Sequence, residues 1–562
     1  MEYAGSHAAA PFELPPGRHR TPSEEQDDKM ARQKNNGPAA SAEPRTETPL
    51  VDFVDRTSDA LDRVASRIPS AWKTPLCMLM VLILGLVMYF AGRAEPTHAF
   101  WDENYHVTSA ERYLAGVGQL EPHPPLGLML IALGEKLSGA NAGIDKTPLL
   151  ADKYINGDKI PEGFSFAGMR LMPSLFGALG ALLFLGLMIE LTGSRLIGLL
   201  FSSLYLFENA WIVHFRAVHL DSFQMFFCIG TLWMFLRMWK QTSALSWRQY
   251  AGMALLCGLG IMIKVNAAML LALFPVIYFK DAGTRGIGFS WTAQLRHFGI
   301  KAGASVATVL LVTATTFTLH AIVGTKPVPP GSSGNTDNEF MSQTYKDYLG
   351  QQQTLTPSTL LAISTDYFKF MDHDHKGVPK LDVCKPGENG SHPLHWPIQD
   401  KTINYRWDSA NGFTRYVQLV GNQVSWYLGL AAVLLSFLTI ANRRLFNIDT
   451  GNGRSYALIE VFTAIYVVFM LLHLYLGAQR VMYLYHYFIG LLISYLLIVL
   501  NWQNLCDFHK VRKSVRRLSA LLIALAILAS GMFFLPLSNH WPLNKEQCER
   551  RNIFSHIVSC QG

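Results

Sequence analysis

Charged residues are scarce in this sequence, and cysteines are too few to define a disulfide scaffold. Only 16% of the 562 residues are charged and only 7 are cysteine, whereas 50% are hydrophobic. The hydrophobic residues gather in blocks of about twenty, the helix length that crosses the hydrocarbon core of a bilayer; examples are residues 74–92, 457–473 and 517–535. This composition excludes the soluble, fibrous and disulfide-rich classes and predicts an all-α polytopic membrane protein.

Two further signals are absent. No apolar stretch follows a short basic start, so the N-terminus does not resemble a signal peptide. The basic residues behind the net charge of +7 lie in short connections between apolar blocks, which argues against nucleic-acid binding. Residues 1–70 are polar, so we expect a disordered cytoplasmic tail there, with a short surface helix over 51–67 as the alternative.

The apolar blocks predict about eleven transmembrane helices, at residues 74–92, 166–191, 196–213, 220–238, 249–264, 266–280, 299–321, 425–441, 456–475, 482–501 and 518–536. Lys and Arg concentrate in every second connection, as in the basic cluster 510–517, which is typical of cytoplasmic loops.

This topology places three segments outside the cytoplasm: the loops 93–165 and 322–424, and the tail 537–562, in which Cys548 and Cys560 can pair. Both loops are too long for simple connectors. The predicted domains are an N-terminal transmembrane region 71–321 that contains the first outer loop, the loop 322–424, and a four-helix region 425–536.

The strongest local signal is a pair of acidic residues, Asp102 and Glu103, directly outside the first span. The edge of a bilayer has a low dielectric constant, which raises the pKa of a carboxyl group toward the range that suits a catalytic base. We therefore interpret Asp102 and Glu103 as catalytic residues. The alternative is that their carboxylates cap a surface helix by accepting hydrogen bonds from its free amides.

Other candidate ligands stand at the outer ends of spans. His123 lies among three prolines, which fix the backbone on either side of it. Isolated cations lie where positive charge is otherwise avoided, and such groups bind phosphate oxygens; they are Arg170, Arg216 (with His214 and His219), Lys264 and Arg480 (with His486). The alternative is that each cation merely extends along apolar surface to the interface. The run 372–375, Asp-His-Asp-His, suggests a metal, but no spaced partner motif accompanies it.

These pieces together resemble the protein O-mannosyltransferase family of the glycosyltransferase C superfamily, over about residues 74–535. Seven strings in family order carry the resemblance: WDENYH (101–106), HPPLG (123–127), MRLMPSLFGALGALL (169–183), ENAWIVHFRAVHLDSF (208–223), KVN (264–266), HPLHWPI (392–398) and RVMYLYHYF (480–488). Two features depart from the family pattern. Residues 264–267 read KVNA instead of KWNG, and the second outer loop lacks the length of the eukaryotic lectin-like insertion, which points to a bacterial type.

The resemblance implies an inverting transferase that moves mannose from polyprenyl-phosphate-mannose to Ser or Thr of exported proteins, with Asp102 activating the acceptor hydroxyl. From the same strings we add candidate ligands of the donor and its lipid carrier: Asp221, His392, Trp396, Tyr485 and His486. Arg and Lys can supply positive charge at the leaving phosphate, so we expect no metal cofactor.

The implied setting is a bacterial inner membrane with the active site outside the cytoplasm, and family members can pair as homodimers or heterodimers. Two alternatives remain open: a related transferase with a lipid or glycan acceptor, and a transporter. We find no internal repeat of the kind that transporters often show.

Overall fold

The structure is a computed structural model and describes residues 49–284, 290–329, 336–450 and 453–553, together with Val558 and Cys560. The described residues divide into two units, with the boundary after Ala60. Helix α2 comprises Pro49–Arg67. The disordered tail predicted for residues 1–70 is therefore wrong for 49–67, where apolar residues recur at helical spacing and the alternative of a helix is correct. Residues 1–48 lie outside the described residues.

Within the described residues, eight helical segments are long and apolar enough to cross a membrane. They are α3 with η1 (Ser70–Phe90), α7 (Leu171–Thr192), η3 with α13 (Val265–Thr284), α14 (Trp291–Val323), α18 (Gln423–Leu445), α19 (Gly453–Gly477), η5 with α20 (Leu484–Phe508) and α21 (Lys513–Ser538). A ninth results if α8 (Arg195–Phe201), α9 (Ser203–Leu206) and α10 (Asn209–Phe215) form one span with a 65° bend. The chain is thus a multi-pass membrane protein.

The predicted number of eleven spans is not confirmed. The two remaining predictions, 220–238 and 249–264, coincide with α11 (Asp221–Lys240) and α12 (Trp247–Ile261). Helix α12 has only 15 residues, and α11 contains Gln224, Arg237 and two tryptophans, which lower its mean hydropathy.

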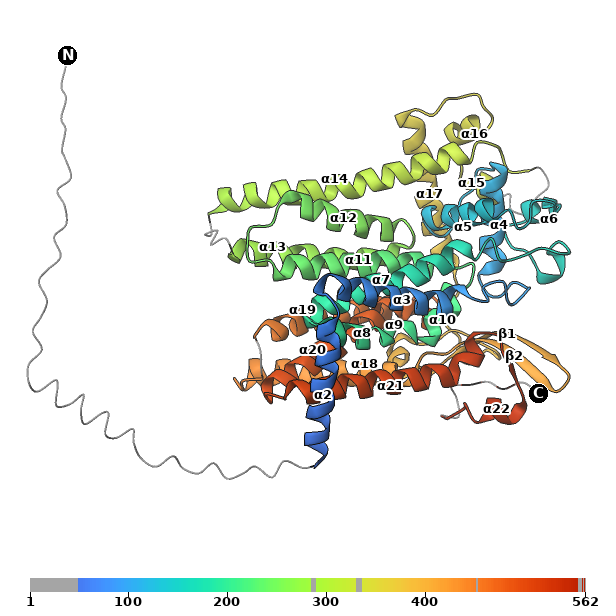
Figure 1. Ribbon diagram of the computed structural model, residues 1–562. Coiled ribbons are helices and arrows are strands. Elements are labelled where there is room, and N and C mark those ends of the chain that lie inside the picture. The colour runs from blue at the N-terminus through green and yellow to red at the C-terminus, as the bar shows by residue number, and fades with distance from the viewer. Residues whose placement is uncertain are drawn as a thin grey trace, which may run out of the picture. The chain divides into compact units, whose positions relative to one another are not determined.

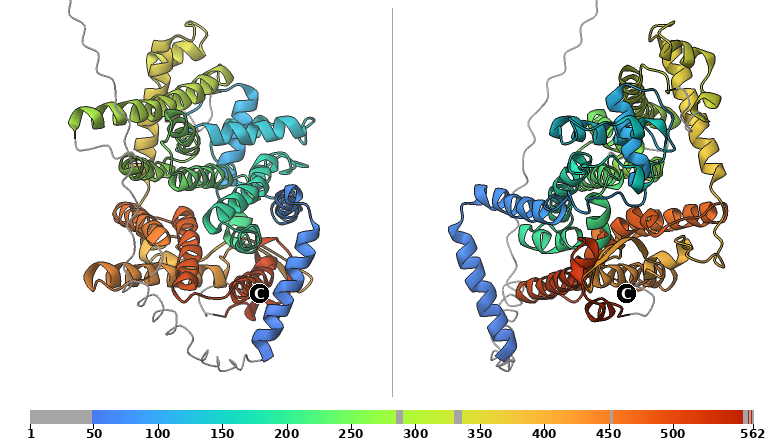
Figure 2. Two further views of the ribbon diagram at one scale, coloured as in Figure 1. Left: turned by 60° about the vertical axis from the view of Figure 1, so that its left-hand side comes forward. Right: turned by 90° about the vertical axis from the view of Figure 1, so that its right-hand side faces the viewer.

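The long helices lie side by side, and the shorter elements of the outer segments gather toward one end of them (Figure 1). These shorter elements are α4 (Glu103–Ala115), α5 (Leu126–Ser138), α6 (Thr147–Ala151), η2 (Gly157–Lys159), α15 (Thr336–Phe340), α16 (Gln343–Leu349), α17 (Pro357–Gly377), η4 (Pro393–Ile398) and α22 (Lys545–Glu549). Helices α18–α21 lie on one side of the helix bundle, and α12–α14 lie on the opposite side (Figure 2).

The predicted helical fold is confirmed, and the described residues add one small antiparallel sheet to it. Strands β1 (Ile403–Ala410) and β2 (Phe413–Leu419) form a hairpin, and β2 also pairs with β3 (Pro542–Leu543) from the C-terminal tail. The tail is closed by a disulfide between Cys548 and Cys560. The sheet therefore joins the second outer loop to the segment that follows the last span.

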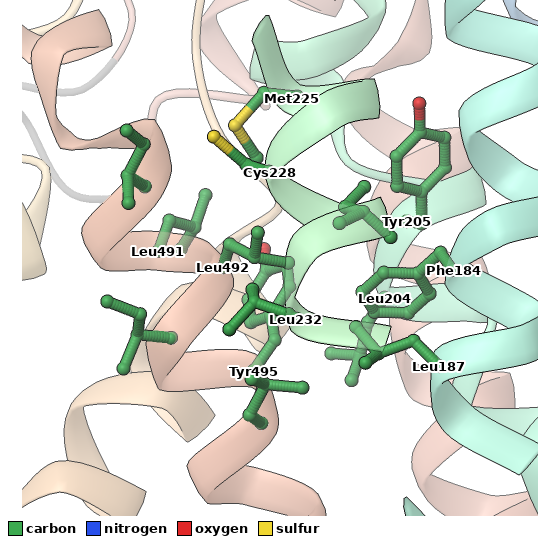
Figure 3. Packing of buried hydrophobic residues seen from close by; sticks show 14 of the residues in the cluster. Phe184, Leu187, Leu204, Tyr205, Met225, Cys228, Leu232, Leu491, Leu492 and Tyr495 are labelled. Carbon is green, nitrogen blue, oxygen red and sulfur yellow. The ribbon is translucent and has the colours of Figure 1, made fainter. Parts of the chain in front are cut away.

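The core lies where α7, α11 and α20 meet (Figure 3). Phe184 and Leu187 of α7, Met225 and Leu232 of α11, and Leu491 of α20 are all at most 1% exposed. Helix α20 is apolar on all sides, which is typical of a helix at the centre of a bundle. These three helices thus form a rigid base for the segments that follow α10 and precede α20.

A buried carboxylate sets the bend between α9 and α10. Glu208 is fully buried and accepts hydrogen bonds from the Asn422 amide (3.0 Å), the Trp426 indole (3.1 Å) and the Ser425 hydroxyl (2.9 Å). It also accepts a hydrogen bond from the Tyr495 hydroxyl. A fully satisfied carboxylate of this kind is tolerated in an apolar interior, and it joins the start of α10 to the start of α18 and to α20.

Candidate active site

Asp102 stands on the turn before α4, and none of the described residues hydrogen-bonds to its carboxylate. Trp101 adopts a left-handed backbone conformation (φ 53°), and its ring packs against Tyr405 and Tyr485 at centroid distances of 4.9 and 6.4 Å. The backbone carbonyl of Asp102, not its side chain, accepts the first helical hydrogen bonds, from the amides of residues 105 and 106 (both 3.0 Å). The capping alternative is therefore wrong for Asp102.

Glu103 is fully buried and fully paired. Its Oε1 accepts hydrogen bonds from Arg170 Nε (2.8 Å) and the Val218 amide (2.7 Å), and its Oε2 accepts from Arg170 Nη2 (2.7 Å) and the Phe100 amide (3.1 Å). Arg170 is also fully buried and donates its other hydrogens to the backbone carbonyls of Arg93, Ala94, Pro96 and His98.

All donors of Arg170 and both oxygens of Glu103 are therefore occupied within the protein. This pairing does not support the predictions that Glu103 takes part in the chemistry and that Arg170 binds a carrier phosphate, which stay predictions. The bidentate ion pair ties the first outer loop to the start of α7, and the hydrogen bond from the Val218 amide ties Glu103 to the turn before α11. We assign both side chains to positioning of Asp102.

A second polar cluster lies on the segment between α10 and α11. The Asp221 carboxylate contacts His214 Nδ1 through Oδ2 (3.0 Å) and Lys264 Nζ through Oδ1 (2.8 Å). His214 Nε2 lies 2.7 Å from the Tyr405 hydroxyl, and His219 Nδ1 lies 3.3 Å from His214 Nδ1. The structure thus brings the predicted ligands Asp221 and Lys264 together as a buried ion pair.

This cluster acts electrostatically on Asp102. Burial raises the pKa of the Asp102 carboxyl to about 6 from its ordinary 3.8, the Lys264 cation opposes the rise, and the Asp221 anion adds to it. A carboxylate with a pKa near neutrality, and with no hydrogen-bond donor among the described residues, is suited to accept a proton from a substrate.

Three further groups, His123, His375 and Arg480, are linked to the Lys264 cation and to one another. Burial, followed by the charge of Lys264, holds the pKa of His123 well below its usual range, and the His123 ring lies 6.4 Å from that of His375. Burial and the charge of Arg480 lower the pKa of His375. The Nε of Arg480 is buried, and it has no hydrogen-bond partner among the described residues. Two predicted cations, Lys264 and Arg480, therefore face one region together with the predicted His123.

The aromatic string before α20 forms one wall of this region. Lys264 Nζ lies 5.6 Å from the centre of the Tyr485 ring, and Tyr485 stacks on His486 at 4.6 Å. Trp396 is fully buried, donates to the Ser391 hydroxyl (2.9 Å) and lies parallel to His486 at 6.3 Å. Trp396 therefore packs beside His486, and its role as a ligand of the carrier stays a prediction.

The remaining predicted ligands lie elsewhere. Arg216 donates to the Asn539 side chain and to the Gly92 carbonyl (2.8 Å), so it links the end of the first span to the end of α21. His392 is exposed and accepts a hydrogen bond from the Leu394 amide (3.4 Å) at the start of η4. The predictions that both residues bind the donor or carrier are not supported by this placement.

Two features of the site differ from the sequence interpretation. Tyr405, on β1 of the second outer loop, was not predicted, because a single tyrosine in a strand carries no motif. The run 372–375 does not bring three metal-ligand atoms together; among the described residues, the group that does so is His214, His219 and Asp221.

Comparison with known proteins identifies the family of this chain. The family model described as "Dolichyl-phosphate-mannose-protein mannosyltransferase" matches residues 79–323, and the model "C-terminal four TMM region of protein-O-mannosyltransferase" matches residues 369–557. The chain is 25% identical over 285 residues to dolichyl-phosphate-mannose–protein mannosyltransferase 2 of Candida albicans, which covers 48% of this chain and 34% of that protein. It is 30% identical over 158 residues to protein O-mannosyl-transferase 2 of Danio rerio, which covers 28% and 19%.

The chain therefore spans about a third or less of the length of these curated relatives. Among solved structures, a chain of the Saccharomyces cerevisiae protein O-mannosyltransferase Pmt1-Pmt2 complex bound to the sugar donor aligns with a TM-score of 0.71. The alignment covers 88% of this chain and 94% of that chain at 14% identity, so it shows a shared fold. The two family models together take in the Asp102 turn, the Asp221–Lys264 pair and the four C-terminal helices, and the chain belongs to the protein O-mannosyltransferase family, with the glycosyltransferase C fold.

Proposed function

We propose that this chain transfers mannose from polyprenyl-phosphate-mannose to Ser or Thr hydroxyls of exported proteins, with inversion at the anomeric carbon. The observation that carries the proposal is the state of the Asp102 carboxyl group. Its pKa is raised to about 6, and it accepts no hydrogen bond from a described residue. Family membership supports the sugar donor, because two family models named for this activity match the chain.

In the proposed reaction, the acceptor hydroxyl gives its proton to the Asp102 carboxylate as its oxygen attacks the anomeric carbon. The bond between that carbon and the phosphate oxygen breaks, and the polyprenyl phosphate leaves with the bonding electrons. Phosphate is a good leaving group, so no general acid is needed. The proton remains on Asp102 until solvent removes it, which is compatible with a pKa near neutrality.

Lys264 and Arg480 are the cations that we assign to the leaving phosphate. Negative charge on the phosphate increases as the bond breaks, and preorganised cations at the edge of a low-dielectric region stabilise that charge. Lys264 is paired with Asp221 and packs near Tyr485, whereas the buried Nε of Arg480 has no hydrogen-bond partner among the described residues. Arg480 is therefore the group whose charge is available to an incoming anion.

We place the reaction on the extracytoplasmic face, with the loops 93–165 and 322–424 outside. Basic residues 510–517 at the start of α21 indicate the cytoplasmic side, and the disulfide of the C-terminal tail suits an oxidising compartment. The short second outer loop supports a bacterial inner membrane as the location. Pairing with a second chain stays a prediction.

The deciding experiment follows the label from radiolabelled polyprenyl-phosphate-mannose in the presence of purified protein, a Ser/Thr peptide and membrane lipids. We expect label on the peptide, released by β-elimination. Label on a lipid or glycan would support the alternative acceptor class. Uptake of label into vesicles without a new glycosidic bond would support a transporter and overturn the proposal.

A further inference from the structure

Three ligand atoms converge between α10 and α11. His214 Nδ1 lies 3.0 Å from Asp221 Oδ2 and 3.3 Å from His219 Nδ1, and one ligand atom from each residue lies within 4.8 Å of the others. All three side chains are buried. Ligands placed about 2.0–2.2 Å from a tetrahedral Zn²⁺ are separated from each other by about 3.3–3.6 Å. The two separations from His214 Nδ1 are within a few tenths of an ångström of that geometry, and the third, between His219 and Asp221, is at most 4.8 Å.

Residues from other parts of the chain hold the segment that carries these ligands in place. The Val218 amide donates to Glu103 (2.7 Å), and the Val218 carbonyl lies 2.6 Å from His106 Nδ1. His214 Nε2 is held by the Tyr405 hydroxyl at 2.7 Å. A hydroxyl can donate or accept, so Tyr405 permits the His214 tautomer whose Nδ1 carries a free lone pair. Such an outer contact orients the histidine ligands of metal sites.

The His219 ring makes its polar contact through one nitrogen. Nδ1 faces the cluster, 3.3 Å from His214 Nδ1, whereas Nε2 is buried and has no hydrogen-bond partner among the described residues. The cluster is therefore the polar surrounding of this buried imidazole, and a ligand role for Nδ1 is compatible with it.

We propose that His214, His219 and Asp221 bind one first-row divalent cation, with Zn²⁺ as the best match. Two imidazoles and one carboxylate suit Zn²⁺, Co²⁺ or Ni²⁺, whereas Mg²⁺ and Ca²⁺ prefer oxygen ligands. Three protein ligands leave a fourth position open, as in sites where the metal also contacts a small molecule. The proposal does not depend on the mannosyl transfer reaction.

Lys264 makes the proposal distinguishable from a purely structural role. Its Nζ pairs with Asp221 Oδ1, while Oδ2 of the same carboxylate faces the imidazoles. A metal on Oδ2 therefore competes with Lys264 for the charge of one carboxylate. Replacing Lys264 by methionine should tighten Zn²⁺ binding about tenfold, because it removes a cation that is close to the metal position. Loss of a structural ion pair alone would not increase metal affinity.

The test uses the full-length protein purified in detergent without a histidine tag. Equilibrium dialysis against Zn²⁺ gives the stoichiometry and affinity, and Co²⁺ substitution gives the visible absorption of a tetrahedral site. We expect one Zn²⁺ per chain, loss of that binding in His214→Gln and His219→Gln, and a loss of about 10–100-fold in affinity in Tyr405→Phe.

His473→Gln is the matched control, because His473 is also a buried histidine, and its Nδ1 contacts the Phe469 carbonyl (2.8 Å). It should bind Zn²⁺ like the unmodified chain. Equal Zn²⁺ binding by His219→Gln and the unmodified chain would overturn the proposal, as would binding that is lost only in His373→Gln of the exposed run 372–375. If His219→Gln fails to fold, Lys264→Met decides, and unchanged or weaker Zn²⁺ binding in that variant overturns the proposal.

Discussion

Glu103→Gln should lower the stability of the folded protein, whereas Asp102→Asn should leave it nearly unchanged. Glu103 accepts four hydrogen bonds, two from Arg170 and one each from the amides of Phe100 and Val218. In Glu103→Gln, an NH₂ group replaces one of the two carboxylate oxygens. That NH₂ group would face one Arg170 N–H and one backbone N–H, and it cannot accept a hydrogen bond from either. Arg170, which is 0% exposed, would also keep its charge without a counter-ion.

The size of the effect follows from these contacts. Breaking a buried ion pair by removing one partner costs about 3–5 kcal/mol of unfolding free energy. The Asp102 carboxylate accepts no hydrogen bond from a described residue, so Asp102→Asn should change stability by less than about 0.5 kcal/mol. Substitution of these two adjacent carboxylates should therefore have different effects: Glu103→Gln lowers the stability, and Asp102→Asn lowers the transfer rate.

The assay compares thermal unfolding of the two single variants and the unmodified protein in the same detergent. Arg170→Leu serves as the second test of the pair, because it leaves Glu103 buried without its partner and should be at least as unstable as Glu103→Gln. If Glu103→Gln unfolds at the temperature of the unmodified protein, the pair does not anchor the first outer loop, and the positioning role that we assign to it is wrong.

Three further predictions test the charges and the topology. The transfer rate should fall about tenfold per pH unit below pH 6, because Asp102, whose pKa is raised to about 6, must be deprotonated to accept a proton; a rate that is flat from pH 7 to 4.5 would contradict this. Arg480→Ala should weaken donor binding about ten- to a hundredfold, whereas Arg444→Ala, which removes an exposed ion pair with Glu460, should not; equal donor affinities in the two variants would reject Arg480 as a phosphate ligand. Reporter fusions at Ser514 and Gly390 should report opposite sides of the membrane, and the same side for both would refute the topology.

The membrane class and most span positions could be predicted because long apolar blocks permit few alternatives. The count could not, because α12 is short and α10 continues α8 and α9 after a 65° bend. Glu208 lies at that bend, and its hydrogen-bond partners Asn422 and Tyr495 are more than 200 residues away in the sequence. Local composition does not contain such distant contacts.

The candidate site could be predicted only in part, because it also depends on contacts between residues that are distant in the sequence. Asp102, Lys264 and Arg480 could be selected because each is an ionisable residue at the edge of an apolar block. Arg170 and Arg216 share that property but face inward, toward carbonyls and carboxylates of the protein itself. Sequence position distinguishes a cation at the membrane edge from a buried one, but it does not show whether the cation already has a partner. Tyr405 required the hairpin to reach His214.

The central claim is that Asp102 deprotonates the acceptor. The most direct measurement is the rate of mannose transfer from polyprenyl-phosphate-mannose to a Ser/Thr peptide by Asp102→Asn at matched enzyme levels. Asp372→Asn is the control, because Asp372 is an exposed carboxylate paired with Lys376. We expect a loss of about 10²–10⁴ in rate for Asp102→Asn, with unchanged thermal unfolding, and no loss for the control. A near-normal rate in a folded Asp102→Asn protein would contradict the account.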